Sequence, residues 1–377
     1  MKFTIEHSVL SNALAHVQTI VEKRTTNPLL SNVKITASES GLVLDATDND
    51  MELSEQIPAN VAEEGVITVP AHKMYEIVRN LPQGSEVQCV LNPENQQMKI
   101  TAGRSRFTLG TLSGEEFPSI SDGDMTNRFN INATTILNLI NKTSFAVSME
   151  ETRYYLNGIY MHNYVKTSDS GEEVQLLRAV ATDGHRLACT ETEMPVGGVG
   201  MPGVIIPRKA INELSKLLAG CEEDVEVALS TYKIRFKFKN LVLTSLLIDG
   251  TFPEYERVIP MDNDKVANIN AQTLSSVVAR VACMTEKSHS IRLSFAKDLL
   301  TLSATNAEEG GTAQDEMEIV YDGEQVDIGF NFTYLDAILK QIKSSELVLE
   351  FANSTSPTLL KDIKDDRTLY VLMPLRV

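Results

Sequence analysis

Positive charge is scarce in this sequence. Its 377 residues include 34 Lys and Arg against 51 Asp and Glu, so the formal net charge is −17. Binding to phosphates takes clustered Lys and Arg, and this balance therefore argues against a general nucleic-acid binder. Hydrophobic residues make up 42% of the chain and charged residues 23%. This composition is globular, and the length suggests two or three domains.

Long apolar runs are also missing. No stretch approaches the roughly 20 residues that span a bilayer. Residues 1–7 lack the apolar core of a signal peptide, and residues 374–377 carry no prenylation signal. The four cysteines are scattered without the spacing of metal ligands. We therefore expect reduced thiols in a cytoplasmic protein that has no membrane association and no metal or cofactor.

An internal repeat runs through the chain. Ala-Thr-Asp or Ala-Thr-Asn steps begin at residues 46, 181 and 304. Val-Pro at 69, Ile-Pro at 206 and Phe-Asn at 330 each lead into a helical pattern. Phe-Pro recurs at 117 and 252, and Ile-Asn-Ala recurs at 131 and 269. Several anchors in one order at similar intervals indicate three copies of one unit.

Each copy combines two amphipathic helices with strand patterns. Apolar residues recur at positions i, i+3, i+4 and i+7 in residues 74–81 and 335–342. Residues 233–239 alternate basic and apolar side chains, which is typical of a strand with one solvated face. We predict an α+β fold of three repeated domains, residues 1–121, 128–260 and 261–377. Each domain would pack two helices on antiparallel sheets.

Charge is distributed unevenly between the predicted elements. Helices predicted at 8–24, 70–81, 133–147, 207–218, 271–282 and 331–343 contain eleven basic and four acidic residues, a sum of +7 that leaves −24 elsewhere. Helix propensity alone favours Lys and Arg, but Glu shares that propensity and is nearly absent here. If the six helices face one way, they form a basic surface for a polyanion on an acidic body.

Signs of catalysis are weak. Residues 182–186 form the densest polar cluster, in which Asp183 and His185 could orient a nucleophile such as Ser144. No Gly-x-Ser-x-Gly elbow, phosphate loop or His-Glu-x-x-His helix accompanies this cluster. A hydrolase and an unrelated three-domain adaptor stay open as alternatives.

The last nine residues are too apolar for a frayed chain end. Residues 369–372 fit a final core strand. Met373, Pro374 and Leu375 beyond it would lie at the surface, where they make an adaptable groove for apolar peptide anchors.

The whole chain resembles the beta subunit family of bacterial DNA polymerase III, the replicative sliding clamps. The motifs are MKFT at the start, GRSRF at 103, RYYLNG at 153, ATDGHRLA at 181, DGTFPEY at 249 and VLMPLR at 371. The resemblance implies a head-to-tail homodimeric ring of six domains, with twelve helices lining a hole for duplex DNA. It also implies a processivity factor without a catalytic site, because a closed ring holds DNA topologically and without sequence preference.

The resemblance further implies a pocket between the second and third domains. There the replicative polymerase, the clamp loader and repair proteins would dock through a short motif with a Gln and apolar anchors. The matching positions are Leu156, Thr182, Gly184, His185, Arg186, Leu187, Pro253, Arg257, Val258, Thr355, Pro357, Leu372, Met373, Pro374, Leu375 and Arg376.

Two further sets of residues follow from the resemblance. The positions that match DNA contacts are Arg24, Lys73, Tyr154, Tyr155, Arg208 and Lys209. His72 stands where Arg is expected, and Met149 and Glu150 stand where polar or neutral residues often contact DNA. The dimer contact is implied for Phe107 and Leu109 of the first domain against Cys283 and Met284 of the third.

Overall fold

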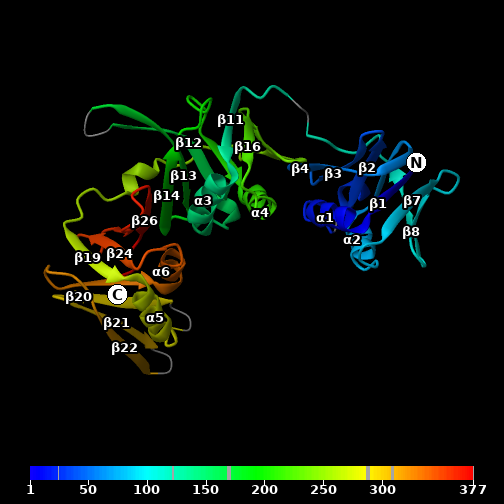
Figure 1. Cartoon of the computed structure of the whole chain (residues 1–377). Coiled ribbons are helices and arrows are strands. Elements are labelled where there is room, and N and C mark those ends of the chain that lie inside the picture. The colour runs from blue at the N-terminus through cyan, green and yellow to red at the C-terminus, as the bar shows by residue number, and fades with distance from the viewer. Residues whose placement is uncertain (24, 121–122, 168–170, 286–288, 307–309, 377) are drawn as a thin grey trace. The chain divides into compact units, whose positions relative to one another are not determined.

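The chain folds into two compact units (Figure 1). The first comprises Met1–Thr134, Pro195–Gly198 and Lys209–Leu247, and the second comprises Thr135–Met194, Val199–Arg208 and Ile248–Val377. This computed structural model describes residues 1–23, 25–120, 123–167, 171–285, 289–306 and 310–376. Arg24 and Ser121, the predicted end of the first domain, lie outside them. Within these ranges, no helix has both the length and the apolarity that crossing a membrane requires.

Two antiparallel sheets build the first unit. Their strand orders are β5-β1-β7-β8-β9 and β10-β6-β2-β3-β4-β18-β17-β16-β11. The strands are β1 Lys2–Glu6, β2 Asn32–Ser38, β3 Gly41–Thr47, β4 Met51–Ile57, β5 Asn60–Glu63, β6 Gly65–Pro70, β7 Glu86–Asn92, β8 Gln97–Ala102, β9 Ser105–Gly110, β10 Leu112–Ser113, β11 Asn127–Asn132, β16 Asp224–Leu229, β17 Lys233–Phe238 and β18 Leu241–Leu246.

The second unit also has two antiparallel sheets. Their strand orders are β15-β12-β13-β14-β26-β25-β24-β19 and β22-β21-β20-β23. The strands are β12 Gly158–Thr167, β13 Glu173–Thr182, β14 Arg186–Glu193, β15 Val204–Pro207, β19 Lys265–Asn270, β20 Ser290–Ala296, β21 Leu299–Asn306, β22 Gly311–Glu318, β23 Val326–Asn331, β24 Glu346–Phe351, β25 Thr358–Asp362 and β26 Thr368–Leu372.

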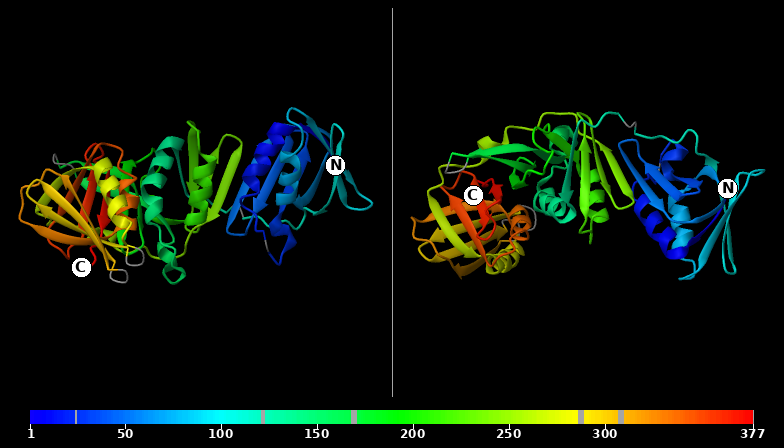
Figure 2. Two further views of the ribbon diagram at one scale, coloured as in Figure 1. Left: turned by 90° about the horizontal axis from the view of Figure 1, so that it is seen from below. Right: turned by 45° about the horizontal axis from the view of Figure 1, so that its top comes forward.

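Amphipathic helices cover these sheets. The α-helices are α1 His7–Val17, α2 Ala71–Arg79, α3 Ala133–Thr143, α4 Arg208–Leu217, α5 Ala271–Ala282 and α6 Phe332–Leu339. Short 3₁₀ helices are η1 Pro28–Ser31, η2 Ser144–Ala146, η3 Glu151–Leu156 and η4 Tyr255–Val258. Helices α1 and α2 lie side by side, and so do α5 and α6 (Figure 1, Figure 2). Each bundle of side chains between helix and sheet removes apolar surface from water, which is the main stabilising term.

The threefold repeat predicted from the sequence is confirmed. Ala46, Ala181 and Ala304 lie at corresponding places on β3, β13 and β21, and all three are buried. The repeats are joined through shared sheets. Strand β4 of the first repeat pairs with β18 of the second, and β14 of the second pairs with β26 of the third.

Several predicted helices are too long. The helix expected at 133–147 ends at Thr143, and the helix expected at 331–343 ends at Leu339, before Lys340 and Lys343. The helix expected at 8–24 ends at Val17, after which the amide of Thr19 bonds to His16 O and the amide of Ile20 to Val17 O in tight turns. Counted over the observed helices, seven basic residues stand against three acidic ones. The helix charge is therefore +4, not +7, and the remainder of the chain carries −21.

The solvated strand face predicted at 233–239 is partly wrong. On β17, the side chain of Lys237 is exposed, but Lys233 is fully buried, with Nζ 5.4 Å from the centre of the Tyr232 ring. Strand alternation predicts which side chains share a face, but it does not predict which end of that face another segment covers.

Candidate functional site

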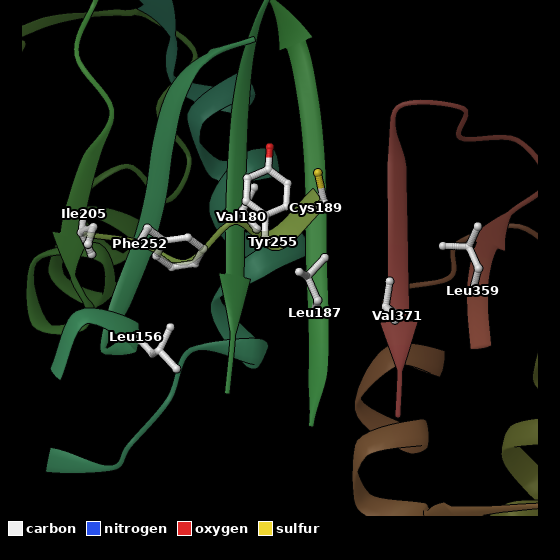
Figure 3. Packing of buried hydrophobic residues seen from close by; sticks show 9 residues of the cluster. All are labelled: Leu156, Val180, Leu187, Cys189, Ile205, Phe252, Tyr255, Leu359 and Val371. Atoms are coloured by element: carbon white, nitrogen blue, oxygen red, sulfur yellow. The ribbon is translucent and has the colours of Figure 1, made fainter. Parts of the chain in front are cut away.

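An apolar floor lies where β14 meets β26 in the second unit (Figure 3). Its members come from both the second and the third repeat, and all of them are buried. They are Leu156, Val180, Leu187, Cys189, Ile205, Phe252, Tyr255, Leu359 and Val371. Two expected pocket residues, Leu156 and Leu187, are thus part of the floor.

The turn between β13 and β14 forms one rim of this floor. Thr182 Oγ1 donates to Arg186 O at 2.7 Å and accepts from the Gly184 amide at 3.1 Å. Asp183 Oδ1 accepts from the amides of His185 and Arg186, each at 3.0 Å. Gly184 has φ +86°, and a Cβ there would lie 2.6 Å from Arg153 Nη1. The side chains of Thr182 and Asp183 and the positive φ of Gly184 are therefore what the turn requires locally.

The chain end lies directly beside this turn and completes the same rim. Leu372 is fully buried and pairs with Arg186, and the Met373 amide donates to His185 O at 2.9 Å. The Leu375 amide donates to Gly329 O at 2.8 Å, so the backbone after β26 is held on both sides. The Met373 side chain is 37% exposed. The predicted surface position of this methionine is thus what the structure has.

Arg186 fastens the rim to its surroundings. Its Nε contacts Asp183 Oδ2 at 3.1 Å and its Nη2 donates to Phe145 O at 2.7 Å. Its guanidinium lies over the Tyr334 ring at 4.6 Å. Tyr334, on α6, also stacks on His185, with ring centres 5.7 Å apart. The sequence reasoning missed Tyr334, because nothing in a helical pattern indicates contact with a turn some 150 residues away.

The other expected pocket residues lie on exposed segments of the same unit. Pro253, Arg257 and Val258 are exposed on and beside η4. Thr355 and Pro357 follow Asn353, whose Oδ1 accepts from the amide and hydroxyl of Thr355 at 2.9 Å each. Pro374 and Leu375 are half-buried and Arg376 is exposed.

The arrangement at Asp183 differs from a catalytic triad. Both of its carboxylate oxygens bond to the turn or to Arg186, and the His185 ring stacks on Tyr334. Ser144 lies in η2. In a triad the carboxylate would instead orient the imidazole. Among the residues that the structure describes, no cluster of three or more His, Cys, Asp or Glu is placed to hold a metal.

The expected DNA contacts are divided between the units, and Arg24 lies outside the described residues. In the first unit, Lys73 Nζ pairs with Glu76 at 2.7 Å, and Lys209 Nζ pairs with Asp48. In the second, Tyr154 is 53% exposed, and Tyr155 packs against the apolar floor.

The structure also describes Arg208, His72 and Glu150, three positions for which the resemblance implies a role near DNA. Arg208 has a buried Nη1 without a hydrogen-bond partner in the described chain. His72 Nδ1 is 3.0 Å from Gln18 Oε1, and burial together with the charge of Lys23 lowers the pKa of His72. Glu150 forms an ion pair with Arg153 at 2.6 Å, and this hydrogen bond lowers the pKa of Glu150.

The expected dimer contacts lie at sheet and helix ends. Phe107, 39% exposed, and Leu109 are on β9, an edge strand of the five-stranded sheet. Cys283 is exposed at the end of α5, and Met284 follows it. A Cβ at Gly311, on the edge strand β22, would meet the Met284 side chain.

Three α+β repeats joined by shared antiparallel sheets define the clamp fold. Family models of the DNA polymerase III beta subunit match as its N-terminal domain over residues 1–121, its central domain over 130–254 and its C-terminal domain over 256–376. The chain therefore belongs to the DNA polymerase III beta subunit family, the sliding clamps.

Individual relatives agree over their full lengths. The beta sliding clamp of Caulobacter vibrioides is 46% identical, with 100% of each chain covered. A solved Caulobacter crescentus beta sliding clamp is 45% identical, covers 100% of this chain and 99% of its own, and has a TM-score of 0.96. A solved Bartonella birtlesii clamp bound to griselimycin is 43% identical over 100% of both chains, with a TM-score of 0.95. The function of the chain is that of a DNA sliding clamp.

Proposed function

We propose that two copies of this chain close head to tail into a ring around duplex DNA. The ring would contain six domains, three from each copy, with boundaries near residues 1–121, 128–260 and 261–377. Phe107 and Leu109 of one copy would meet Cys283 and Met284 of the other. The exposed edge strands β9 and β22 support this pairing, because unpaired strand edges readily join another chain.

The ring acts in the cytoplasm as a processivity factor without a catalytic site. DNA held topologically needs only weak contacts, and strong phosphate binding would hinder sliding. The helices carry a net +4 on a chain of −17, which gives each copy a modestly basic set of elements. Among the described candidates, Lys73, Tyr154, Tyr155, Arg208 and Lys209 contact DNA.

The joint of β14 and β26 binds linear peptides of the replicative polymerase, the clamp loader and repair proteins. One observation carries this proposal: the turn of residues 182–186 and the chain end are joined by backbone hydrogen bonds next to a buried apolar cluster, and Met373 beside them is exposed. Apolar anchors of a peptide would fill this site, while the rim supplies polar groups. Tethering then raises the effective concentration of the polymerase at the primer end.

The topological mechanism is tested by loading the protein onto nicked circular DNA and then cutting the circle. We expect long retention on the circle and rapid loss after linearisation, measured by gel filtration at physiological salt. Equal retention on both DNA forms contradicts the ring. Native mass spectrometry of the free protein, which should show two chains, is the independent control.

A further inference from the structure

The pocket wall that carries Pro253, Arg257 and Val258 has few backbone ties to the rest of its unit. Within the described chain, the backbone-to-backbone hydrogen bonds of residues 249–262 stay inside that segment. Immediately before this segment, the amide of Ile248 donates to Ile205 O on β15. Side chains must therefore hold this wall in place.

Two aromatic residues anchor the wall on β12 and β13. Phe252 is 8% exposed and stacks on Tyr160, with ring centres 4.8 Å apart and an interplanar angle of 7°. Tyr255 is 6% exposed and belongs to the same apolar floor, near Val180 and Cys189 (Figure 3). Apolar contact holds the wall against the sheet. Because this contact is non-directional, it does not fix the orientation of the wall.

Hydrogen bonds of the Tyr255 hydroxyl fix the orientation of the wall. The hydroxyl accepts a hydrogen bond from Arg178 Nη1 at 3.2 Å and lies 2.9 Å from His162 Nε2. His162 Nδ1 is 2.9 Å from Asn163 O, which can only accept, so Nδ1 carries the proton. Burial lowers the pKa of His162 against the opposing hydrogen bond to Asn163 O, and the charge of Arg178 lowers it further, which favours the neutral ring. Nε2 is then an acceptor, and Tyr255 donates to it at 2.9 Å rather than to Glu256 Oε1, which lies farther away at 3.4 Å.

The partners of this hydroxyl are themselves fixed across the sheet. His162 on β12, Arg178 on β13 and Glu191 on β14 stand directly opposite one another in one row. Arg178 is 8% exposed, and its Nε and Nη2 donate to Glu191 Oε2 at 3.0 and 2.6 Å. A buried ion pair with defined hydrogen bonds specifies geometry even where its net contribution to stability is small.

We propose that Tyr255 is a positioning residue for peptide binding. Its hydroxyl, held between Arg178 and His162, fixes the wall of Pro253, Arg257 and Val258 where a peptide can use it. This inference rests on the proposed peptide pocket and names a determinant of affinity within it. Tyr255 itself is buried beneath the wall, so it acts through the exposed residues that follow it.

The expected consequence is a loss of preorganisation when the hydroxyl is removed. Tyr255→Phe keeps the ring in the floor but leaves Arg178 Nη1 and His162 Nε2 without this partner. The wall then samples other positions, and a peptide must select the competent one. We expect peptide affinity to fall about five- to tenfold. Dimer mass and retention on circular DNA should not change.

The probe is a fluorescein-labelled hexapeptide with one Gln and two Leu, titrated by fluorescence anisotropy. Tyr164→Phe is the matched control, because it removes a hydroxyl from a ring that already lies over Arg178, 3.1 Å from its Cζ. Thermal unfolding of each variant reports whether the fold persists. We expect unchanged affinity for the Tyr164 variant.

Rescue separates positioning from a general loss of stability. His162→Ala removes the acceptor and should weaken the peptide about as much as Tyr255→Phe. His162→Gln places an amide where the imidazole was and should restore most of the affinity. The double variant Tyr255→Phe with His162→Ala should be no weaker than Tyr255→Phe alone, because Tyr255→Phe has already removed the hydrogen bond to His162.

The outcomes distinguish this inference from the pocket itself. If the wild type binds the peptide, Met373→Ala abolishes binding and Tyr255→Phe binds normally, the positioning role is wrong and the pocket stands. If the losses of peptide affinity in His162→Ala and Tyr255→Phe are additive and His162→Gln restores none of the affinity, the hydrogen bond between Tyr255 and His162 has no positioning role. If the wild type does not bind at all, both proposals fail.

Discussion

The ammonium group of Lys209 on α4 contacts the carboxylate of Asp48 in the turn between β3 and β4. Only 5% of the Asp48 side chain is exposed, against 49% for Lys209. Asp48 Oδ1 accepts from the amides of Asp50 at 3.0 Å and Met51 at 2.7 Å. The ion pair therefore fastens a helix of the second repeat to a turn of the first.

The same turn recurs at the candidate peptide site. There Asp183 Oδ1 accepts from the amides of His185 and Arg186, and its Oδ2 contacts Arg186 Nε. A Thr-Asp turn thus occurs at both joints between repeats, but the cation that pairs with the Asp carboxylate differs. It comes from α4 at the first joint and from the turn itself at the second. A charge already engaged by Asp48 is less available to DNA than the family resemblance alone implies.

Lys209→Met should destabilise the protein. It leaves the buried Asp48 carboxylate without its cation, and since Lys209 is half-exposed we expect a loss of about 1–2 kcal/mol. Thermal unfolding should shift down by about 2–5 °C. The control is Lys297→Met, which breaks an ion pair with Asp322 that is exposed on both sides and should change little. Equal shifts in both variants would contradict a structural role for Lys209.

Gly184→Ala should cost more than an ordinary glycine substitution. At φ +86° an alanine is strained, and its Cβ would also lie 2.6 Å from Arg153 Nη1. We expect a loss of about 1–2 kcal/mol together with weaker peptide binding. Gly84→Ala is the matched control, since its φ is +71° and nothing lies within 4 Å of an added Cβ. The difference between the two unfolding midpoints isolates the contact with Arg153, and no difference would argue against that contact.

Much of the fold is predictable from apolar periodicity. The helix expected at 271–282 is observed as Ala271–Ala282, because its apolar stripe and its end coincide. The first helix is different. Ile20 and Val21 are buried although they follow the helix, so the apolar pattern continues past its end at Val17. The apolar pattern predicts which side chains are buried, and burial can continue along the chain after the helical hydrogen bonds have ended.

The candidate site is predictable only in part. Its backbone comes from local motifs, such as Asp183 and Gly184 in a turn, and these are visible in the sequence. Its long-range partners are not. Tyr334 stacks on His185 and Arg178 bonds to Tyr255 because sheet pairing brings distant segments together. Neither contact leaves a periodic or spaced signal.

Acid should weaken the third repeat through Asp362. Burial opposes ionisation of this carboxyl, but hydrogen bonds from Ser344, Lys364 and Lys343 outweigh it and lower its pKa to about 2. Because the folded pKa lies below the unfolded value of about 3.9, this stabilisation is present above pH 4 and is lost as pH falls towards 2. It amounts to about 2 kcal/mol at neutral pH.

Asp362→Asn makes that pH dependence measurable. The variant should unfold at lower temperature than the wild type at pH 7, and the gap should close between about pH 4 and 2. Asp322→Asn, at a site that is 88% exposed, serves as the control and should show little gap at either pH. A gap for Asp362→Asn that stays constant down to pH 2 would show that the loss is not electrostatic.

Met373→Ala should abolish peptide binding while leaving the fold intact. The Met373 amide donates to His185 O whichever side chain is present, so the rim backbone stays in place. What is lost is the exposed thioether above the apolar floor, an adaptable contact for apolar anchors. We expect peptide affinity to fall by more than about tenfold, with an unchanged dimer mass. Met149→Ala removes the same atoms at a position that is 78% exposed and should bind normally. Unchanged affinity for the Met373 variant would contradict a peptide site at the β14–β26 joint, since among residues 373–376, the described part of the tail, no other exposed side chain is as apolar and as flexible.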